Sequence, residues 1–259
     1  MGRVANPRVP RRLSERLDAD LGTDPVGDDP RRRTTTGELV AEHVRQLVFD
    51  GVLRPGDRVP QGDLAAELGV SRLPVREAVI ELARDGLVSV TPHTGAFIAP
   101  FDAEVMRQHF AIVGLVQGLA AREVAVAADS TVLAALGTAV DRIDAAATAG
   151  DAAAAHGATI DFLRTLNLAG GSARQQAVLR ALARMLPTGF FADVPGATAS
   201  EQRAAHRVLD ALRTGDPVLA EQACLVSQRE HAELVVAHQE ARGVFARPGP
   251  APGPDGPLA

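Results

Sequence analysis

Two arginines four residues apart, Arg72 and Arg76, are the side chains of this 259-residue chain best suited to bind a polyanion. On a helix this spacing puts both on one face, and a guanidinium fork fits guanine O6 and N7 or a phosphate. Ser71 precedes them, so its hydroxyl and the free N–H groups of the first helical turn can hold a backbone phosphate. The pattern favours contact with DNA. The alternative is an ordinary structural helix whose two arginines pair with Glu77 or Asp85.

Missing residue types exclude several kinds of catalysis. All 27 basic residues are Arg, and the chain has no Trp or Tyr, which excludes a Schiff-base lysine, a Walker-type phosphate lysine and a phenolic acid or base. The single Cys224 excludes an intrachain disulfide and a cysteine zinc cluster. The sequence also shows no Ser-His-Asp ordering, metal pair or phosphate loop. We predict that the protein is not an enzyme; the alternative is a helical-bundle enzyme tethered to DNA.

The overall charge limits how nucleic acid could be bound. The formal net charge is −5, so the whole molecule offers no attractive field to DNA and any such site must be a local patch. No run of eighteen apolar residues and no apolar signal core at the N-terminus are visible. We therefore expect a soluble, cytoplasmic protein that does not enter a membrane.

Three short helices are predicted to position the arginine pair. Thr36 is a candidate N-cap for the first helix, which ends at Asp50-Gly51, and the second spans 62–68 and stops at Gly69. Ser71 caps the third, and Pro74 falls in its first turn, where a missing N–H costs nothing. The buried stripe of that third helix comprises Val75, Ala78, Val79 and Leu82.

Two β-rich runs follow the third helix, at 87–91 and 96–99. Between them lies Pro92-His93-Thr94-Gly95, so His93, Thr94 and Gly95 form the tip of a hairpin that would reach an adjacent DNA groove. Three helices and a hairpin within about 65 residues predict a winged helix-turn-helix domain over 34–100.

The rest of the chain is predicted to be helical between two disordered ends. Six helices at about 102–128, 130–149, 151–169, 172–190, 199–214 and 216–242 predict an all-α antiparallel bundle over 101–243. The fold class is therefore mainly α. Residues 1–33 lack apolar periodicity and are predicted to be a disordered arm, and the Pro-rich stretch 244–259 a disordered tail.

The winged region carries a specific pattern, formed by Leu53 to Arg58, Leu64 to Ala78, Leu82, Gly86-Leu87-Val88 and Gly95. The pattern resembles the GntR superfamily of bacterial transcription regulators, and the helical remainder is similar to its FCD branch. The resemblance implies a homodimer that binds double-stranded DNA at a palindromic operator. The contacts that it implies fall on Ser71, Arg72, Pro74, Arg76 and the wing residues His93, Thr94 and Gly95. Leu73 stands where the family usually has Thr, and its apolar side chain would contact a thymine methyl.

The resemblance also implies where a metal would bind, since many FCD domains hold a divalent ion with one Asp and three His. The matching positions here are Thr159, Leu163, His206 and Ser227, so one imidazole remains of four ligands. One imidazole cannot hold an ion with useful affinity. We therefore expect no metal and no other cofactor. The alternative is an atypical site formed by His206 and His231.

Loss of the metal changes the expected effector. The FCD branch tends to carry Arg and Glu where this chain has Val113 and Gln117, so the interior should be nearly neutral. Burying a carboxylate without a cation is costly, and the expected effector is a small molecule, neutral or largely apolar. The candidate effector-binding residues are Gln117, Thr159, Leu163, Asn167, His206 and Ser227. We predict a ligand-responsive repressor released by this effector; the alternative is a structural DNA-binding dimer without one.

Overall fold

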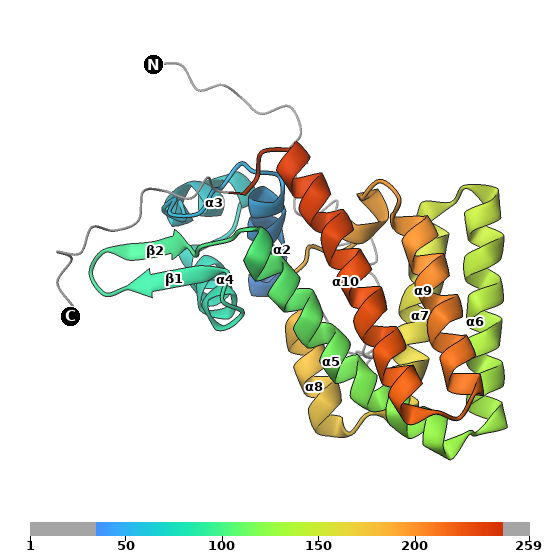
Figure 1. Cartoon of the computed structure of the whole chain (residues 1–259). Helices are drawn as coiled ribbons and strands as arrows, with labels where there is room; N and C mark the ends of the chain where they lie inside the picture. The colour runs from blue at the N-terminus through green and yellow to red at the C-terminus, as the bar shows by residue number, and fades with distance from the viewer. Residues whose placement is uncertain (1–34, 246–259) are drawn as a thin grey trace, which may run out of the picture.

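The computed structural model describes residues 35–245 and is mainly α-helical, as predicted. The winged unit (residues 36–98) holds three helices and a two-stranded sheet, and the bundle holds α5 to α10. Figure 1 shows the winged unit on one side, the helices α6, α7 and α9 on the other, and α5 and α10 running diagonally between them. The predicted arm lies outside the described residues, as does the tail from residue 246 on.

The first described helix, α2 (Thr36–Phe49), begins at the residue predicted as its cap, so its N-cap lies one residue earlier than predicted. Thr35, not Thr36, is the N-cap: its hydroxyl accepts the N–H of Glu38, and its own N–H donates to the Glu38 carboxylate at 2.7 Å. This reciprocal pair is a capping box. The prediction of Thr36 was wrong because three consecutive threonines offer the same hydroxyl, and only Thr35 has an acidic residue three positions later.

The next two helices form the helix-turn-helix. They are α3 (Gln61–Leu68) and α4 (Arg72–Arg84). Gly69 ends α3 with φ of 65°, in the left-handed region that glycine enters without strain. Ser71 is the N-cap of α4, and the predicted stripe of Val75, Ala78, Val79 and Leu82 is buried. The buried stripe fixes which face of α4 remains exposed.

The wing is the antiparallel pair β1 (Val88–Thr91) and β2 (Gly95–Ile98), in which Val88 lies opposite Ile98 and Thr91 opposite Gly95. Val88, Ala96 and Ile98 are buried, while the tip between the strands is exposed. Arg58 makes an antiparallel bridge to Phe97, which extends the sheet on the outer side of β2.

The bundle contains six α-helices and one 3-10 turn within the described range. They are α5 (Ala103–Ala127), α6 (Ser130–Ala149), α7 (Ala152–Gly170), α8 (Ala173–Ala183), η1 (Phe190–Asp193), α9 (Ala197–Arg213) and α10 (Pro217–Ala241). Five predicted helices agree within a few residues. The predicted 172–190 helix is too long, because Pro187 disfavours helical geometry at the residue before it and removes a helical N–H donor.

One hydrophobic cluster joins the winged unit to the bundle. Phe49 of α2 packs against Phe101, with ring centroids 5.1 Å apart, and against Phe190, 4.9 Å apart. Val244 is buried in the same cluster, and the Phe245 ring lies 5.5 Å from that of Phe101. The predicted tail therefore begins too early, since its first two residues pack on the folded part of the chain.

Candidate nucleic-acid interface and ligand interior

The N-terminal end of α4 presents the predicted DNA-contacting side chains to solvent. Ser71, Arg72 and Arg76 are exposed, and Leu73 is 64% exposed although it is apolar. Pro74 is half-buried in the first turn, next to the buried Val75. The Ser71 hydroxyl makes no capping bond to its own helix, which leaves it free for another acceptor or donor. This end of α4 therefore combines two guanidinium groups, a hydroxyl and an apolar side chain on one exposed surface.

The alternative, in which these arginines pair with acids of their own helix, does not describe the structure. Asp85 lies 2.7 Å from Arg45 of α2, and Glu81 lies 2.8 Å from the same guanidinium. Within residues 35–245, neither Arg72 nor Arg76 takes part in an ion pair. Arg45 thus pairs with Glu81 and Asp85, Glu77 takes part in no ion pair with either arginine in this range, and the two predicted contact arginines keep their donors available.

The wing tip is exposed and adopts a tight backbone turn. His93 has φ of 61° and Gly95 has φ of 127°, both in the left-handed region. A Cβ atom at Gly95 would lie 3.0 Å from the Arg58 guanidinium, so glycine leaves space for that side chain beside the wing. Thr94 is exposed, and its N–H donates to the Thr91 carbonyl.

Arg58 is a basic residue at this interface that the predicted set omitted. It is exposed and lies at the base of the wing. Its place beside Gly95 follows from the bridge to Phe97, which no local pattern around residue 58 indicates.

Most of the predicted ligand-binding side chains of the bundle are buried but already partnered. Gln117 on α5 accepts a hydrogen bond from Gln228 on α10 at 2.9 Å. The Ser227 hydroxyl donates to the Ala223 carbonyl and accepts from Arg207 at 3.1 Å, and the Thr159 hydroxyl donates to a carbonyl of its own helix. Asn167 is the exception, because both polar atoms of its amide are buried without a partner among the described residues.

His206 does not face the interior, contrary to expectation. It is exposed and lies 3.0 Å from the carboxylate of Asp144 on α6. Burial raises the pKa of Asp144, but hydrogen bonds from Gln202 and His206 outweigh that effect and hold it below its usual value. The inward residue on this turn of α9 is the preceding Ala205, while Leu163 is partly buried against the same core.

Two family models match the chain. The model described as bacterial regulatory proteins, gntR family, covers residues 36–98, and the FCD domain model covers residues 108–231. The chain belongs to the GntR family and carries an FCD domain. Both families are transcriptional regulators, so this GntR-family chain is a DNA-binding transcriptional regulator and not an enzyme.

Individual relatives agree with this assignment. An HTH-type transcriptional regulator of Mycobacterium tuberculosis is 31% identical over 227 residues, which cover 85% of this chain and 89% of that protein. A probable D-xylose utilization operon transcriptional repressor of Paenarthrobacter nicotinovorans is 30% identical over 195 residues. The match covers 74% of this chain and 84% of that protein. A solved GntR-type regulator from Rhodococcus sp. RHA1 has a TM-score of 0.53 and 25% identity, covering 79% and 99% of the two chains.

The donor set of this FCD domain does not fit the metal that the family implies. Thr159 and Leu163 replace two ligands on α7, Ser227 replaces one on α10, and His206 points away from them. Within the part of the chain that the structure describes, no three His, Cys, Asp or Glu side chains gather around a point that an ion could occupy. His231, the other half of the atypical pair, is buried on α10 while His206 is exposed on α9.

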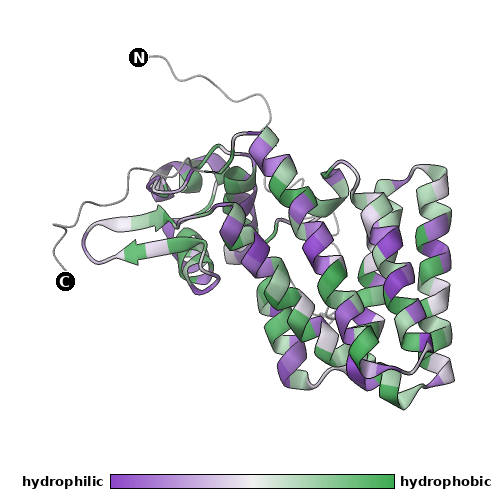
Figure 2. Cartoon of the chain, in the orientation of Figure 1, coloured by the Kyte–Doolittle hydropathy of each residue, from purple (hydrophilic) through white to green (hydrophobic). Residues whose placement is uncertain are grey.

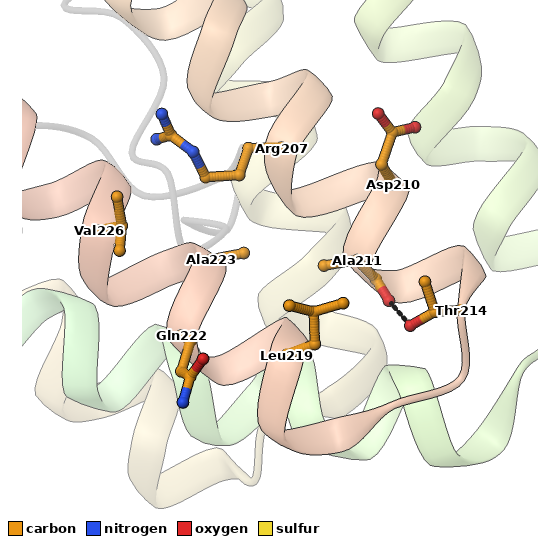
Figure 3. A pocket seen from close by; sticks show the side chains of 8 residues that line it. All are labelled: Arg207, Asp210, Ala211, Thr214, Leu219, Gln222, Ala223 and Val226. Carbon is orange, nitrogen blue, oxygen red and sulfur yellow. Dashed lines mark hydrogen bonds between the residues drawn. The ribbon is translucent and has the colours of Figure 1, made fainter.

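A groove on the bundle surface lies apart from the predicted interior. It has a volume of about 480 Å³ and runs between α9 and α10. Figure 3 shows Leu219 and Ala211 facing each other across it, with Arg207 at one end and Thr214 at the other. Its walls are mostly apolar. None of the predicted ligand-binding residues lines it, although His206 and Ser227 are the sequence neighbours of Arg207 and Val226.

The structure brings together a polar cluster that sequence reasoning missed. His156 on α7 lies 2.6 Å from the Glu201 carboxylate on α9, and Glu201 is buried although it is ionisable. Ser200 and His231 are buried beside them. Nothing in the spacing of these four residues indicates their proximity, because they come from three helices that only the bundle packing assembles.

Proposed function

We propose that this regulator is a cytoplasmic repressor that binds a palindromic operator as a homodimer and leaves it when a small effector enters the helical domain. The observation that carries the DNA-binding part is the exposed end of α4, where Ser71, Arg72, Leu73 and Arg76 lie free of internal partners. An α-helix presented in this way fits the major groove. Pro74 holds the first turn, and His93, Thr94 and Gly95 reach the neighbouring groove from the wing.

The repressor assignment and the effector class have separate support. The relative from Paenarthrobacter nicotinovorans is named as a probable repressor, and it covers most of this chain. The interior lacks the metal ligands that would hold a carboxylate, which favours an effector that is neutral or largely apolar. Gln117, Thr159, Leu163, Asn167 and Ser227 remain its candidate contacts.

An effector-less dimer is the weaker alternative. The bundle interior keeps several buried polar atoms without hydrogen-bond partners, on Asn167, Ser200, Glu201 and His231. Such atoms cost free energy unless something satisfies them. Their presence favours a domain that accepts a ligand over one that only dimerises.

The outer side of α5 is the surface that we assign to the second copy of the chain. Ile112, Leu119 and Val126 recur every seven residues, with Leu115 between the first two, and all are between 46% and 66% exposed. Apolar residues at this spacing form the seam of a helix pair. Figure 2 shows hydrophobic residues along this part of α5 and the adjoining part of α10.

The packing of α5 against α7, α8, α9 and α10 makes it a core helix, although its length and composition alone would suit a membrane span.

The dimer is tested by changing this seam. Leu115→Asp with Leu119→Asp should convert the dimer to a monomer and weaken operator binding, because two charges would be buried at the interface. Light scattering coupled to size-exclusion chromatography gives the mass of the particle. Leu168→Asp is the control, since Leu168 on α7 is 52% exposed but lies outside the seam. A double variant that stays folded and dimeric would exclude this interface.

The operator is tested by selecting random duplex DNA with the purified full-length protein. We expect a palindrome whose half-sites lie about one helical turn apart, the spacing set by a symmetric winged dimer. A selected sequence without two-fold symmetry would contradict the dimeric binding mode. Genome-wide occupancy then identifies the regulated operon, and higher expression of that operon after deletion of the gene is the result expected of a repressor.

A further inference from the structure

The buried polar cluster of His156, Ser200, Glu201 and His231 has the features of a ligand site. The side chain of Glu201 is only 3% exposed, and the His156 side chain that bonds it is 20% exposed. His156 is therefore the more solvent-accessible member of the pair. Three helices contribute, α7, α9 and α10, so the cluster lies where the bundle elements converge.

Three atoms of this cluster are buried without a partner among the described residues: Glu201 Oε2, Ser200 Oγ and His231 Nε2. Glu201 Oε2 accepts hydrogen bonds and cannot donate one when ionised. Burial lowers the pKa of His231 to about 4, with a backbone hydrogen bond to Ser200 acting in the opposite direction, so the ring is neutral near pH 7. In the tautomer whose other ring nitrogen carries the proton and faces the Ser200 backbone, the unpartnered Nε2 is an acceptor. Two acceptors and one hydroxyl are thus available to bind a molecule that supplies hydrogen-bond donors.

The charges around the cluster favour a neutral molecule. His231 experiences the positive fields of Arg203 and Arg207 and the negative field of Glu230, and Glu201 already receives one hydrogen bond from His156. An anion would meet the Glu201 carboxylate. A cation would be attracted to that carboxylate, but the positive charges of Arg203 and Arg207 act against it. A molecule with several hydroxyl groups supplies donors without adding charge.

An aromatic ring now occupies the space beside these atoms. The ring centroid of Phe191 lies 4.9 Å from that of His231 and 6.3 Å from that of His156. Phe191 belongs to η1, which packs against α7 and α9. A phenyl ring offers no hydrogen-bond partner for the Glu201, Ser200 and His231 atoms, so it fills the position without satisfying it.

The segment that carries Phe191 also holds the winged unit. The neighbouring Phe190 packs edge-on against Phe49 of α2, with centroids 4.9 Å apart. The Thr188 N–H donates to the Glu42 carboxylate of α2 at 2.7 Å. Two consecutive phenylalanines therefore face two different units, one toward the polar cluster and one toward α2. A displacement of the backbone at Phe191 also moves Phe190, because the two residues are adjacent in one 3-10 turn.

We propose that His156, Ser200, Glu201 and His231 bind a small neutral polyhydroxylated molecule that takes the place of the Phe191 ring, and that this displacement withdraws Phe190 from Phe49. The winged unit then loses part of its attachment to the bundle and shifts relative to it, so that the half-site spacing no longer fits. This inference rests on the proposed effector-released repressor and names its effector class and the segment that transmits the change. It replaces the contacts predicted from the sequence, of which Gln117, Thr159 and Ser227 already have hydrogen-bond partners, by the four side chains of this cluster.

The ligand class is tested with the full-length Phe191→Ala variant, in which the site is open. Its melting temperature should rise in a mixture of neutral pentoses, hexoses and alditols, more than that of the unsubstituted protein, which must first displace the ring. Phe162→Ala is the matched control, since Phe162 is also a buried phenylalanine of the bundle but lies in an apolar cluster. Gluconate and glucosamine test the charge. Stabilisation by either ion alone, equal stabilisation of the Phe162→Ala control, or none by the neutral mixture would overturn the assignment.

The acceptor role of Glu201 is tested by Glu201→Gln, alone and with Phe191→Ala. The amide has nearly the same shape and replaces one acceptor oxygen by a donor, so polyol binding should weaken by about tenfold or more. Unchanged polyol affinity would remove Glu201 from the site.

The coupling is tested without any ligand. Phe190→Ala removes the contact with Phe49 and should weaken operator binding, as the ligand does, while leaving polyol binding intact. If Phe191→Ala does not fold, Phe191→Leu replaces it in the ligand-binding test. Normal operator affinity in Phe190→Ala would exclude the transmission step. Operator binding by the unsubstituted dimer is measured first. If the unsubstituted dimer does not bind an operator, the proposed function is wrong, whatever the result for this ligand site.

Discussion

At the scale of single residues, Arg72 and Arg76 differ from Arg45 of the same unit in having no acidic partner among the described residues. Arg45, only 5% exposed in its side chain, is committed to Glu81 and Asp85. Arg72→Ala and Arg76→Ala should each cost about 1–3 kcal/mol of operator binding if the side chain contacts a base. Fluorescence anisotropy on a labelled operator measures the loss. Arg142→Ala, on α6, removes the same charge far from the wing and should leave affinity unchanged, whereas unchanged affinity in both α4 variants would refute the assignment.

Residue positions on the DNA side were predictable because each depends on local sequence. Ser71, Arg72, Leu73 and Arg76 are exposed as the buried stripe of α4 requires. The bundle interior was less predictable, and His206 shows why. A shift of one residue turns a side chain by about 100° around a helix, so matching His206 rather than Ala205 to the inward position exchanged an interior site for a surface one.

At the scale of elements, the end of α7 is fixed by a close approach to α5. A Cβ atom at Gly170 would overlap the carbonyl oxygen of Ala120, whereas one at Gly157, on the same helix, would meet nothing within 4 Å. Gly170→Ala should therefore destabilise the protein by about 1–3 kcal/mol, as overpacking does. Gly157→Ala should stabilise it by about 0.5–1 kcal/mol through higher helix propensity. Urea unfolding followed by circular dichroism measures both, and equal effects of the two substitutions would contradict this account.

The helices themselves were largely predictable, since their ends carry local signals such as the Asp129, Asp151 and Asp216 caps. The connection from α8 to α9 was not. Its role depends on Phe190 and Phe191 meeting α2, α7 and α10, which are far away in sequence. Contacts of this kind arise from tertiary packing, and neither periodicity nor turn chemistry encodes them.

At the scale of the whole molecule, the winged unit and the bundle share one hydrophobic cluster. Gln239 of α10 donates to the Phe49 carbonyl at 3.2 Å, and Arg242 lies 2.8 Å from Asp50, so α10 holds α2 at its C-terminal end. Together with Thr188 and Phe190, these contacts fix the position of the winged unit on the bundle. A ligand that breaks only part of this set changes the relative placement of the two units without unfolding either one, which is what release from a spaced pair of half-sites requires.

The stability of the whole chain should fall in mild acid. Burial lowers the pKa of His109 to about 4 and that of His231 to about 4, from 6.5. Between pH 6.5 and about pH 4 these histidines bind protons in the unfolded chain but not in the folded chain. The free energy of unfolding therefore decreases as the pH falls through this range. Between pH 7 and pH 5 each histidine should cost about 2 kcal/mol. Urea unfolding at both pH values measures the loss. His109→Leu should remove about half of this loss; an unaltered pH dependence in His109→Leu would show that other groups cause it.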